Sequence, residues 1–273
     1  MTAIKNPLLA IVVVIVFSLI PVNANAAEEP DLASILKQHS AALVTVKYVL
    51  TVNMGLGGSG RSAEQESETE LTCSMISSEG LIVCSNNQLT GFSELLKQLS
   101  MKMTAVPKDI QVLVAGREQP YDAEIVIKDT ELDIVWIRIT NGGDTSFEHF
   151  NFTSKTEMNI GDPIAIIRRT GNTFGRTPVI MQSRIGGISS QPRKLYIPHT
   201  QTMNIIGTPA FSASGEVIGL MVTQLPEAGD SMGGSQGMFG SNMMNIQDSM
   251  SGLILPAADV LKATKRAVED LKP

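Results

Sequence analysis

Three side-chain amides follow an apolar run in the segment GLIVCSNNQLTG, residues 80–91. The apolar run is Leu81-Ile82-Val83, and the amides are Asn86, Asn87 and Gln88. An amide donates and accepts hydrogen bonds but does not titrate near neutral pH, so it is a poor proton carrier. A row of amides at the end of a core strand therefore favours hydrogen bonding over acid–base chemistry.

Two cysteines could form a covalent link. Cys73 and Cys84 flank the turn sequence SSEG. If Ser77 to Gly80 form a four-residue hairpin loop with Gly80 left-handed, Ile76 pairs with Leu81 and Cys73 falls opposite Cys84. This register predicts a cross-strand disulfide, because a slip of one residue would put the sulfurs on opposite faces. Two free buried thiols are the alternative.

The first 26 residues are typical of a secretory signal. A single charge, Lys5, precedes the apolar run Leu8 to Ile20, and Ala24-Asn25-Ala26 offers an A-x-A cleavage site. The run is shorter than a membrane span needs, so an uncleaved anchor is the weaker alternative. We therefore expect an exported protein, periplasmic or extracellular, in which disulfides persist. The net charge of −6 argues against nucleic acid as a partner.

Short strand-like segments dominate residues 27–273. After a short helix expected at Asp31 to His39, apolar and β-branched runs such as ALVTVKYVLTV and LDIVWIRI recur between Gly, Pro, Asn and Asp residues. This spacing is typical of an all-β sandwich or barrel. A helix is expected to close the chain at 257–271. Its predicted apolar stripe is Leu261, Thr264, Val268 and Leu271, and its charges form a solvated face.

Two segments interrupt this pattern. Residues 54–70, MGLGGSGRSAEQESETE, are rich in glycine and then acidic; we expect a mobile hairpin loop, because a dinucleotide site would need a helix after the glycines. Residues 228–252 hold five methionines among Gly, Ser and Asn. Thioethers can bind copper(I), but the irregular spacing favours a flexible loop. No Cys/His spacing is typical of a metal site, and we expect no cofactor.

Six phrases occur in an order that resembles the protease domain of the HtrA/Deg group of trypsin-like serine peptidases. They are SSEGLIVCSNNQLTG, YDAEIVIKDTELDIVWIRI, IGDPIAIIRRTG, RIGGIS, GTPAFSASGEVIGL and LILPAADVLKATKRAV. The resemblance implies two six-stranded antiparallel β-barrels with a C-terminal α-helix and catalytic His, Asp and Ser between the barrels. It places barrel one at about 40–145 and barrel two at about 155–256. No PDZ domain is expected, because the chain stops just after the closing helix.

The resemblance also implies where the catalytic groups should stand. The family motif Gly-Tyr-Ile-Leu-Thr-Asn-Asn-His-Val, laid on Gly80 onward, puts its histidine on Asn87, or on Gln88 after a shift of one residue. The family aspartate falls on Asp133, where we expect a remnant of the triad whose carboxylate accepts the side-chain amide of Asn87. An aspartate at the start of a strand is otherwise a common turn or cap acceptor.

The motif Gly-Asn-Ser-Gly-Gly-Pro aligns with Asn204-Ile205-Ile206-Gly207-Thr208-Pro209. Ile206 then stands in the nucleophile position and has no reactive atom, and Asn204 replaces an oxyanion-hole glycine. The oxyanion loop would comprise Asn204, Gly207 and Thr208. The match places a deletion of two residues just upstream of this loop.

The three histidines do not rebuild the missing base. His39 ends the first helix, His149 lies in a loop, and only His199 approaches the loop around Ile206. A surface or structural role fits His199 better, because no Ser or Cys motif is paired with it.

The sequence therefore predicts a secreted pseudopeptidase that keeps the double barrel as a peptide-binding, protein-binding or structural module. An extended peptide or protein in the cleft between the barrels is the expected partner. The alternative is an active serine-type endopeptidase with a rearranged site, which needs a histidine within reach of a Ser or Thr. A metal-binding protein that uses the Met-rich segment is a third hypothesis.

Overall fold

The computed structural model describes residues 29–56, 61–93, 103–200, 205–224 and 252–269. The expected signal segment 1–26, Asn204 and all but the last residue of the Met-rich segment 228–252 lie outside these ranges. No helix in the described part of the chain is both long and apolar enough to cross a membrane.

The first half of the chain forms a closed antiparallel barrel with strand order β1-β2-β3-β6-β5-β4. Its interior is filled by aliphatic side chains from alternating strand positions, together with Tyr48 and Phe147. The strands are β1 (Leu43–Leu56), β2 (Arg61–Met75), β3 (Leu81–Ser85), β4 (Met103–Leu113), β5 (Tyr121–Asp129) and β6 (Ile134–Ile139).

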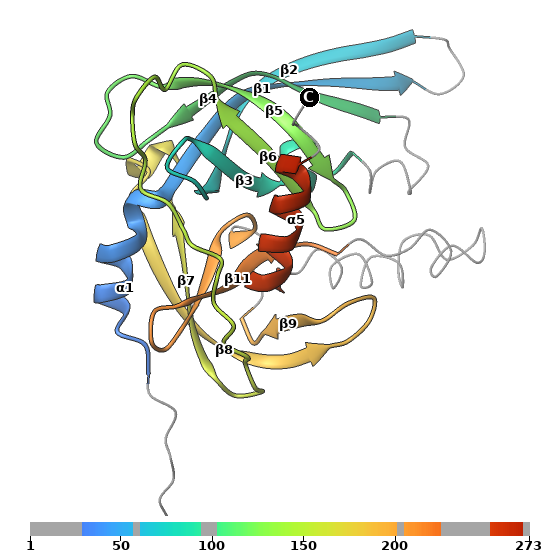
Figure 1. The fold of residues 1–273 in the computed structure, drawn as a ribbon. Coiled ribbons are helices and arrows are strands. Elements are labelled where there is room, and N and C mark those ends of the chain that lie inside the picture. The colour runs from blue at the N-terminus through green and yellow to red at the C-terminus, as the bar shows by residue number, and fades with distance from the viewer. Residues whose placement is uncertain (1–28, 57–60, 94–102, 201–204, 225–251, 270–273) are drawn as a thin grey trace, which may run out of the picture.

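The second half forms another closed barrel, with strand order β10-β11-β12-β9-β8-β7. Two closed six-stranded antiparallel barrels confirm the predicted fold class. Figure 1 shows their arrangement. The strands are β7 (Pro163–Arg169), β8 (Pro178–Ser189), β9 (Leu195–Pro198), β10 (Pro209–Ser212), β11 (Val217–Val222) and β12 (Leu253–Pro256).

Short helices flank the barrels. Asp31 caps α1 (Leu32–His39) by accepting the N–H of Ser34 at 3.1 Å. The other described helices are η1 (Ser40–Ala42), α2 (Asn86–Leu89), η2 (Asn172–Phe174) and the closing α5 (Ala257–Glu269). One apolar cluster contains residues of α1, both barrels and α5. The barrels therefore share part of one core.

Helix α5 packs on small residues. The predicted stripe is offset by one position, because the buried residues are Ala257, Val260, Ala263 and Ala267. Leu261 and Thr264, which the sequence predicts in the stripe, are only half-buried. Trp136 of β6 donates its indole N–H to the hydroxyl of Thr264 at 3.1 Å. Alanines bring the helix close to the barrels, and this leaves Leu261 at the edge of the contact.

The prediction of a mobile loop at residues 54–70 is wrong for most of that segment. Residues 61–70 belong to β2, which pairs with β1 as far as the pair Leu56 and Arg61. The two strands extend as a long ribbon beyond the barrel (Figure 1). Two acidic side chains of β2 form ion pairs: Glu68 with Lys47 of β1 at 3.1 Å and Glu66 with Lys108 of β4 at 3.7 Å. Residues 61–70 therefore form a strand although their sequence is polar, because their backbone pairs with β1 and these ion pairs stabilise the pairing.

The disulfide and its register are confirmed. Cys73 and Cys84 are bonded, with Cα atoms 4.8 Å apart. Gly80 has a φ of 89°, and the N–H of Ile76 donates to the carbonyl of Leu81 at 2.8 Å. The left-handed glycine therefore closes the four-residue loop as predicted.

We expect the double variant Cys73→Ala/Cys84→Ala to lose about 2–4 kcal/mol of unfolding free energy. The reason is that the link constrains the unfolded chain, and both cysteines are fully buried. Urea denaturation measured beside the wild type tests this. Wild-type protein treated with a reductant should shift in the same direction, and an unchanged midpoint in both samples contradicts the prediction.

Candidate functional site

The row of amides lies in a one-turn helix directly after β3. Ser85, the last residue of β3, caps α2 by accepting the N–H of Gln88 at 3.1 Å. Asn86 and Asn87 are buried, whereas Gln88 is half-buried. The strand thus delivers Asn87 into the interior on the first turn of a helix.

Asp133 sits beside this helix and is only 1% exposed. It follows the β5–β6 turn and has a φ of 57°, which is unusual for a residue other than glycine. Its carboxylate accepts the backbone N–H of Asn87 at 2.7 Å and the hydroxyl of Ser85 at 2.9 and 3.0 Å. It also accepts the N–H of Thr223 at 2.8 Å and the Thr223 hydroxyl at 2.7 Å.

The predicted bond between the Asn87 side chain and Asp133 is therefore wrong in its donor. Asn87 does contact Asp133, but through its backbone N–H. The side-chain amide of Asn87 donates instead to the hydroxyl oxygen of Thr223 at 2.7 Å. Thr223 links Asn87 and Asp133, because its hydroxyl accepts the Asn87 amide and donates a hydrogen bond to the Asp133 carboxylate.

Thr223 and Ser85 are site residues that the sequence did not reveal. Thr223 directly follows β11 and belongs to barrel two, whereas Asp133 and Ser85 belong to barrel one. Both hydroxyls are buried, with residue exposures of 2% and 1%. The only available signal was position, since each residue ends an apolar strand.

Burial sets the ionisation of this group. It raises the pKa of Asp133 to about 6, and the hydrogen bonds from Asn87, Thr223 and Ser85 oppose that rise. Because the folded pKa lies above the ordinary value, the protonated form contributes stability in acid. That contribution is lost as the pH rises through about 6.

The loop around Ile206 forms a tight turn before β10. The hydroxyl of Thr208 donates to the carbonyl of Ile205 at 2.5 Å, and the Thr208 N–H donates to the same carbonyl at 3.3 Å. The N–H of Gly207 donates to the carbonyl of Met221 at 2.7 Å. Ile206 itself is only 2% exposed. Asn204, the other residue predicted in this loop, lies outside the described residues.

Gly207 fixes the loop against barrel one. Its φ is 83°, and a Cβ there would lie 3.2 Å from both the Ser85 nitrogen and the Thr72 carbonyl oxygen. The Gly207 carbonyl also accepts the hydroxyl of Ser74 at 3.0 Å. A side chain at this position is excluded by close backbone contact as well as by conformation.

A pocket of about 370 Å³, here called the Ile206 pocket, is lined by residues of both barrels. Its apolar lining includes Leu71, Phe92 and Ile206. The polar lining comes from four threonines, Gln88, Glu70, Arg168 and Arg169.

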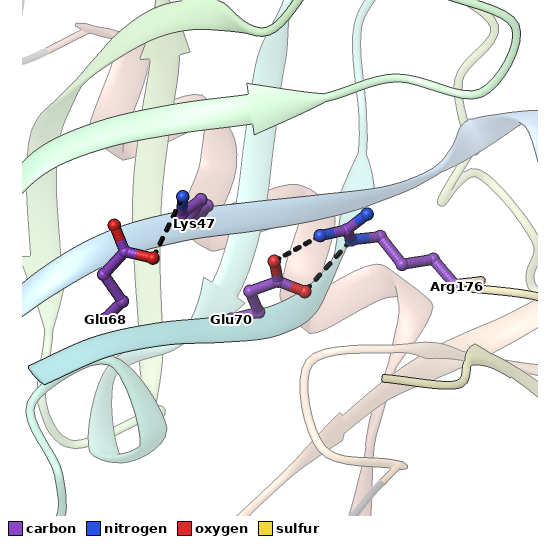
Figure 2. A network of polar contacts seen from close by, with 4 residues as sticks. All are labelled: Lys47, Glu68, Glu70 and Arg176. Atoms are coloured by element: carbon purple, nitrogen blue, oxygen red, sulfur yellow. Dashed lines mark hydrogen bonds and ion pairs between the residues drawn. The ribbon is translucent and has the colours of Figure 1, made fainter. Parts of the chain in front are cut away.

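Two arginines at or near the Ile206 pocket, Arg169 and Arg176, are fixed by hydrogen bonds and an ion pair. The guanidinium of Arg169 donates to the carbonyls of Ser40, Leu43 and Arg176 at 2.8–3.0 Å. Figure 2 shows Arg176 reaching Glu70 of β2, with the closest nitrogen and oxygen 2.5 Å apart, near the pair Lys47 and Glu68. Arg169 ties β7 of barrel two to η1 and β1, and the pair Arg176 and Glu70 ties the β7–β8 loop to β2.

The histidines lie apart from this network. His199 is exposed, and in the described residues no hydrogen bond joins its imidazole to Ile206 or Thr208. His149 is exposed as well. His39 packs against Phe211 with ring centroids 4.7 Å apart, and burial lowers the pKa of its imidazole.

The solved structures similar to this chain include three that match 87% of its length. The HtrA-type protease AlgW with a decapeptide has 16% identity and a TM-score of 0.57. A variant of AlgW with a decapeptide has 15% and 0.57, and the variant with a tripeptide has 15% and 0.55. The chain has the fold of an HtrA-type protease.

This likeness confirms the fold that the sequence resemblance implied. At 15–16% identity it does not establish the activity, and the chain covers only 63–67% of the length of those structures. No protein-family model matches the sequence, and no curated protein matches it.

We expect the Asp133 carboxyl to titrate near pH 6, about two units above an ordinary aspartate. Carboxyl ¹³C NMR across the acid range tests this, with Asp133→Asn used to assign the resonance. The unfolding free energy should fall by about 2 kcal/mol from pH ~4 to ~6.5 relative to that variant. A midpoint near 4 contradicts the effect of burial.

Proposed function

We propose that this chain is an exported pseudopeptidase, a trypsin-like double barrel that binds an extended peptide or protein segment without cleaving it. The observation that carries the proposal is the hydrogen bonding of Asn87. A neutral amide stands in the position that the resemblance assigns to the general base, and that amide is already bonded to Thr223. It can neither accept nor return a proton near neutral pH.

The hydroxyls nearest the site are committed to other partners. Ser85 and Thr223 both donate their hydrogens to Asp133, and both are at least 98% buried. Thr208 donates to a carbonyl within its own turn and is fully buried. An attacking oxygen must reach the carbonyl carbon of a bound peptide, and none of these three is exposed to one.

The backbone donors of the Ile206 loop are also already engaged, so they are not free to stabilise an oxyanion. The N–H groups of Gly207 and Thr208 donate to Met221 and Ile205. Peptide hydrolysis needs donors that are free to meet the developing negative charge. Together with the apolar Ile206 in the nucleophile position, these bonds support binding without turnover.

The Ile206 pocket supports peptide binding. Its lining offers an apolar surface from Leu71 and Phe92 beside the guanidinium of Arg168 and several hydroxyls. Arg168 donates to the carbonyl of Arg169 at 3.2 Å, and the described residues provide no carboxylate within 4.0 Å of it. A segment with one apolar side chain and a nearby carboxylate or carbonyl matches this lining. The titles of the similar AlgW structures also include peptides.

Export is supported by two independent features. Residues 1–26 have the charge, apolar run and cleavage sequence of a secretory signal. The bond between Cys73 and Cys84 is of a kind that persists in oxidising compartments.

We expect no cleavage of casein or of fluorogenic peptides by the mature protein, and no labelling by a fluorophosphonate probe. The single variants Asn87→His and Ile206→Ser should stay inactive, because members of a triad act as a unit. An active HtrA-type protease run in parallel controls for the assay.

The active-peptidase alternative makes the opposite prediction. If one Ser or Thr is labelled stoichiometrically, and cleavage disappears when it is replaced by alanine, the pseudopeptidase proposal is wrong.

We further expect some peptides from an array of decapeptides covering the casein sequence to bind intact. Thr69→Arg should weaken their binding by about tenfold or more, because a long side chain would fill the Ile206 pocket that Thr69 lines. The matched control is Thr104→Arg, at an exposed position on β4. Equal binding by both variants, with unchanged thermal unfolding, would place the peptide elsewhere.

A further inference from the structure

A second hollow lies beside α5, outside the network of Asp133. It has a volume of about 340 Å³ and is bounded by α5 and by residues 152–155, which connect the two barrels. Its apolar lining comes from Phe152, Ala258 and Leu261. Leu261 is available there because the helix packs on its alanines. We call this hollow the α5 groove.

Four cations surround the α5 groove, and no acidic residue lines it. They are Lys155, Lys262, Lys265 and Arg266, and all four are exposed. Among the described residues none of the four lies within 4.0 Å of a carboxylate. Some other exposed cations of the described residues are paired, such as Lys194 with Glu157 at 3.2 Å, and others, such as Lys37 and Arg117, stand singly.

Helix stability explains only part of this cluster: Arg266 lies in the last turn of α5, where a cation is favourable. Lys262 lies three residues before Lys265 and four before Arg266, so the like charges are neighbours on one helix face and destabilise the helix. The whole chain has 27 acidic and 21 basic residues, which makes an unpaired group of cations harder to explain as composition. The arrangement is complementary to a ligand that carries negative charge.

We propose that the α5 groove binds an acidic segment of a partner protein, with one apolar side chain seated on Phe152 and Leu261 and its neighbouring carboxylates at the four cations. An apolar floor favours such a segment over a small inorganic anion, which would leave the floor in water. The cations surround a hollow rather than a flat face, so a protruding side chain fits it better than a membrane surface. This binding is independent of the Ile206 pocket.

The test uses a fluorescein-labelled peptide with a central Leu-Phe pair flanked by glutamates, and its twin with glutamine in place of glutamate. Fluorescence anisotropy should show binding of the acidic peptide alone, weakened strongly between about 0.05 and 0.5 M salt. The variant Lys155→Glu/Lys262→Glu/Lys265→Glu should lose about tenfold or more in affinity. Leu261→Ala should lose several-fold with the salt dependence unchanged.

The matched control is Lys37→Glu/Arg117→Glu/Arg138→Glu, which changes the net charge equally at three exposed positions outside the groove. It should bind like the wild type, and so should Thr69→Arg. Equal loss in the control would show a response to net charge only and overturn the proposal. Failure to bind the acidic peptide would also overturn it, as would a clear preference for vesicles rich in phosphatidylserine.

Discussion

The site depends on one buried carboxylate that is bonded from both barrels. Taking the Asp133 carboxylate out of water is costly unless donors replace the water, and here every described donor comes from a fixed position. The backbone of α2 and the hydroxyl of Ser85 approach from barrel one, and Thr223 approaches from barrel two. Because all of them must converge on two oxygens, the carboxylate sets the orientation of α2 against the end of β11. The contact between Gly207 and β2–β3 joins the barrels again at short range.

The fold was predictable because its strands are short, apolar and bounded by turn residues. The hairpin at Ser77 to Gly80 was predictable in detail, since loop length and a left-handed glycine fix the register. The strand at 61–70 was not, because its side chains at 64–68 are exposed on both faces and as polar as those of a loop. Its strand character comes from backbone pairing with β1 and from ion pairs with cations on neighbouring strands, such as Lys47 of β1 and Lys108 of β4. The buried face of α5 was predicted one position too far along the chain. The prediction followed the large apolar residues, whereas the helix packs through alanines, which allow a closer approach to the barrels.

The sequence predicted which residues of the candidate site lie together, but not which of their atoms form the hydrogen bonds. The resemblance brought Asn87 and Asp133 together, and they do lie in contact. It assumed that the side chain at position 87 makes that contact, as an imidazole does in a catalytic triad. The helical first turn instead aims the backbone N–H at the carboxylate, and the shorter amide reaches the hydroxyl of Thr223. Thr223 could not be found from the sequence, because a threonine after a strand is common and only the packing of two barrels makes it central.

The hydrogen-bonded frame of the site does not require the groups that perform hydrolysis. Asp133 accepts hydrogen bonds from two backbone N–H groups and two hydroxyls, so its carboxylate has partners without an imidazole. Asn87 is satisfied by Thr223, and Ile206 is buried in a turn closed by Thr208. Each position therefore has a structural role that is complete without proton transfer. A rigid frame of this kind suits binding, because a pre-formed pocket loses little conformational entropy when a segment enters it. Under the proposed function, this frame presents the Ile206 pocket and the α5 groove as the surfaces where a partner would bind.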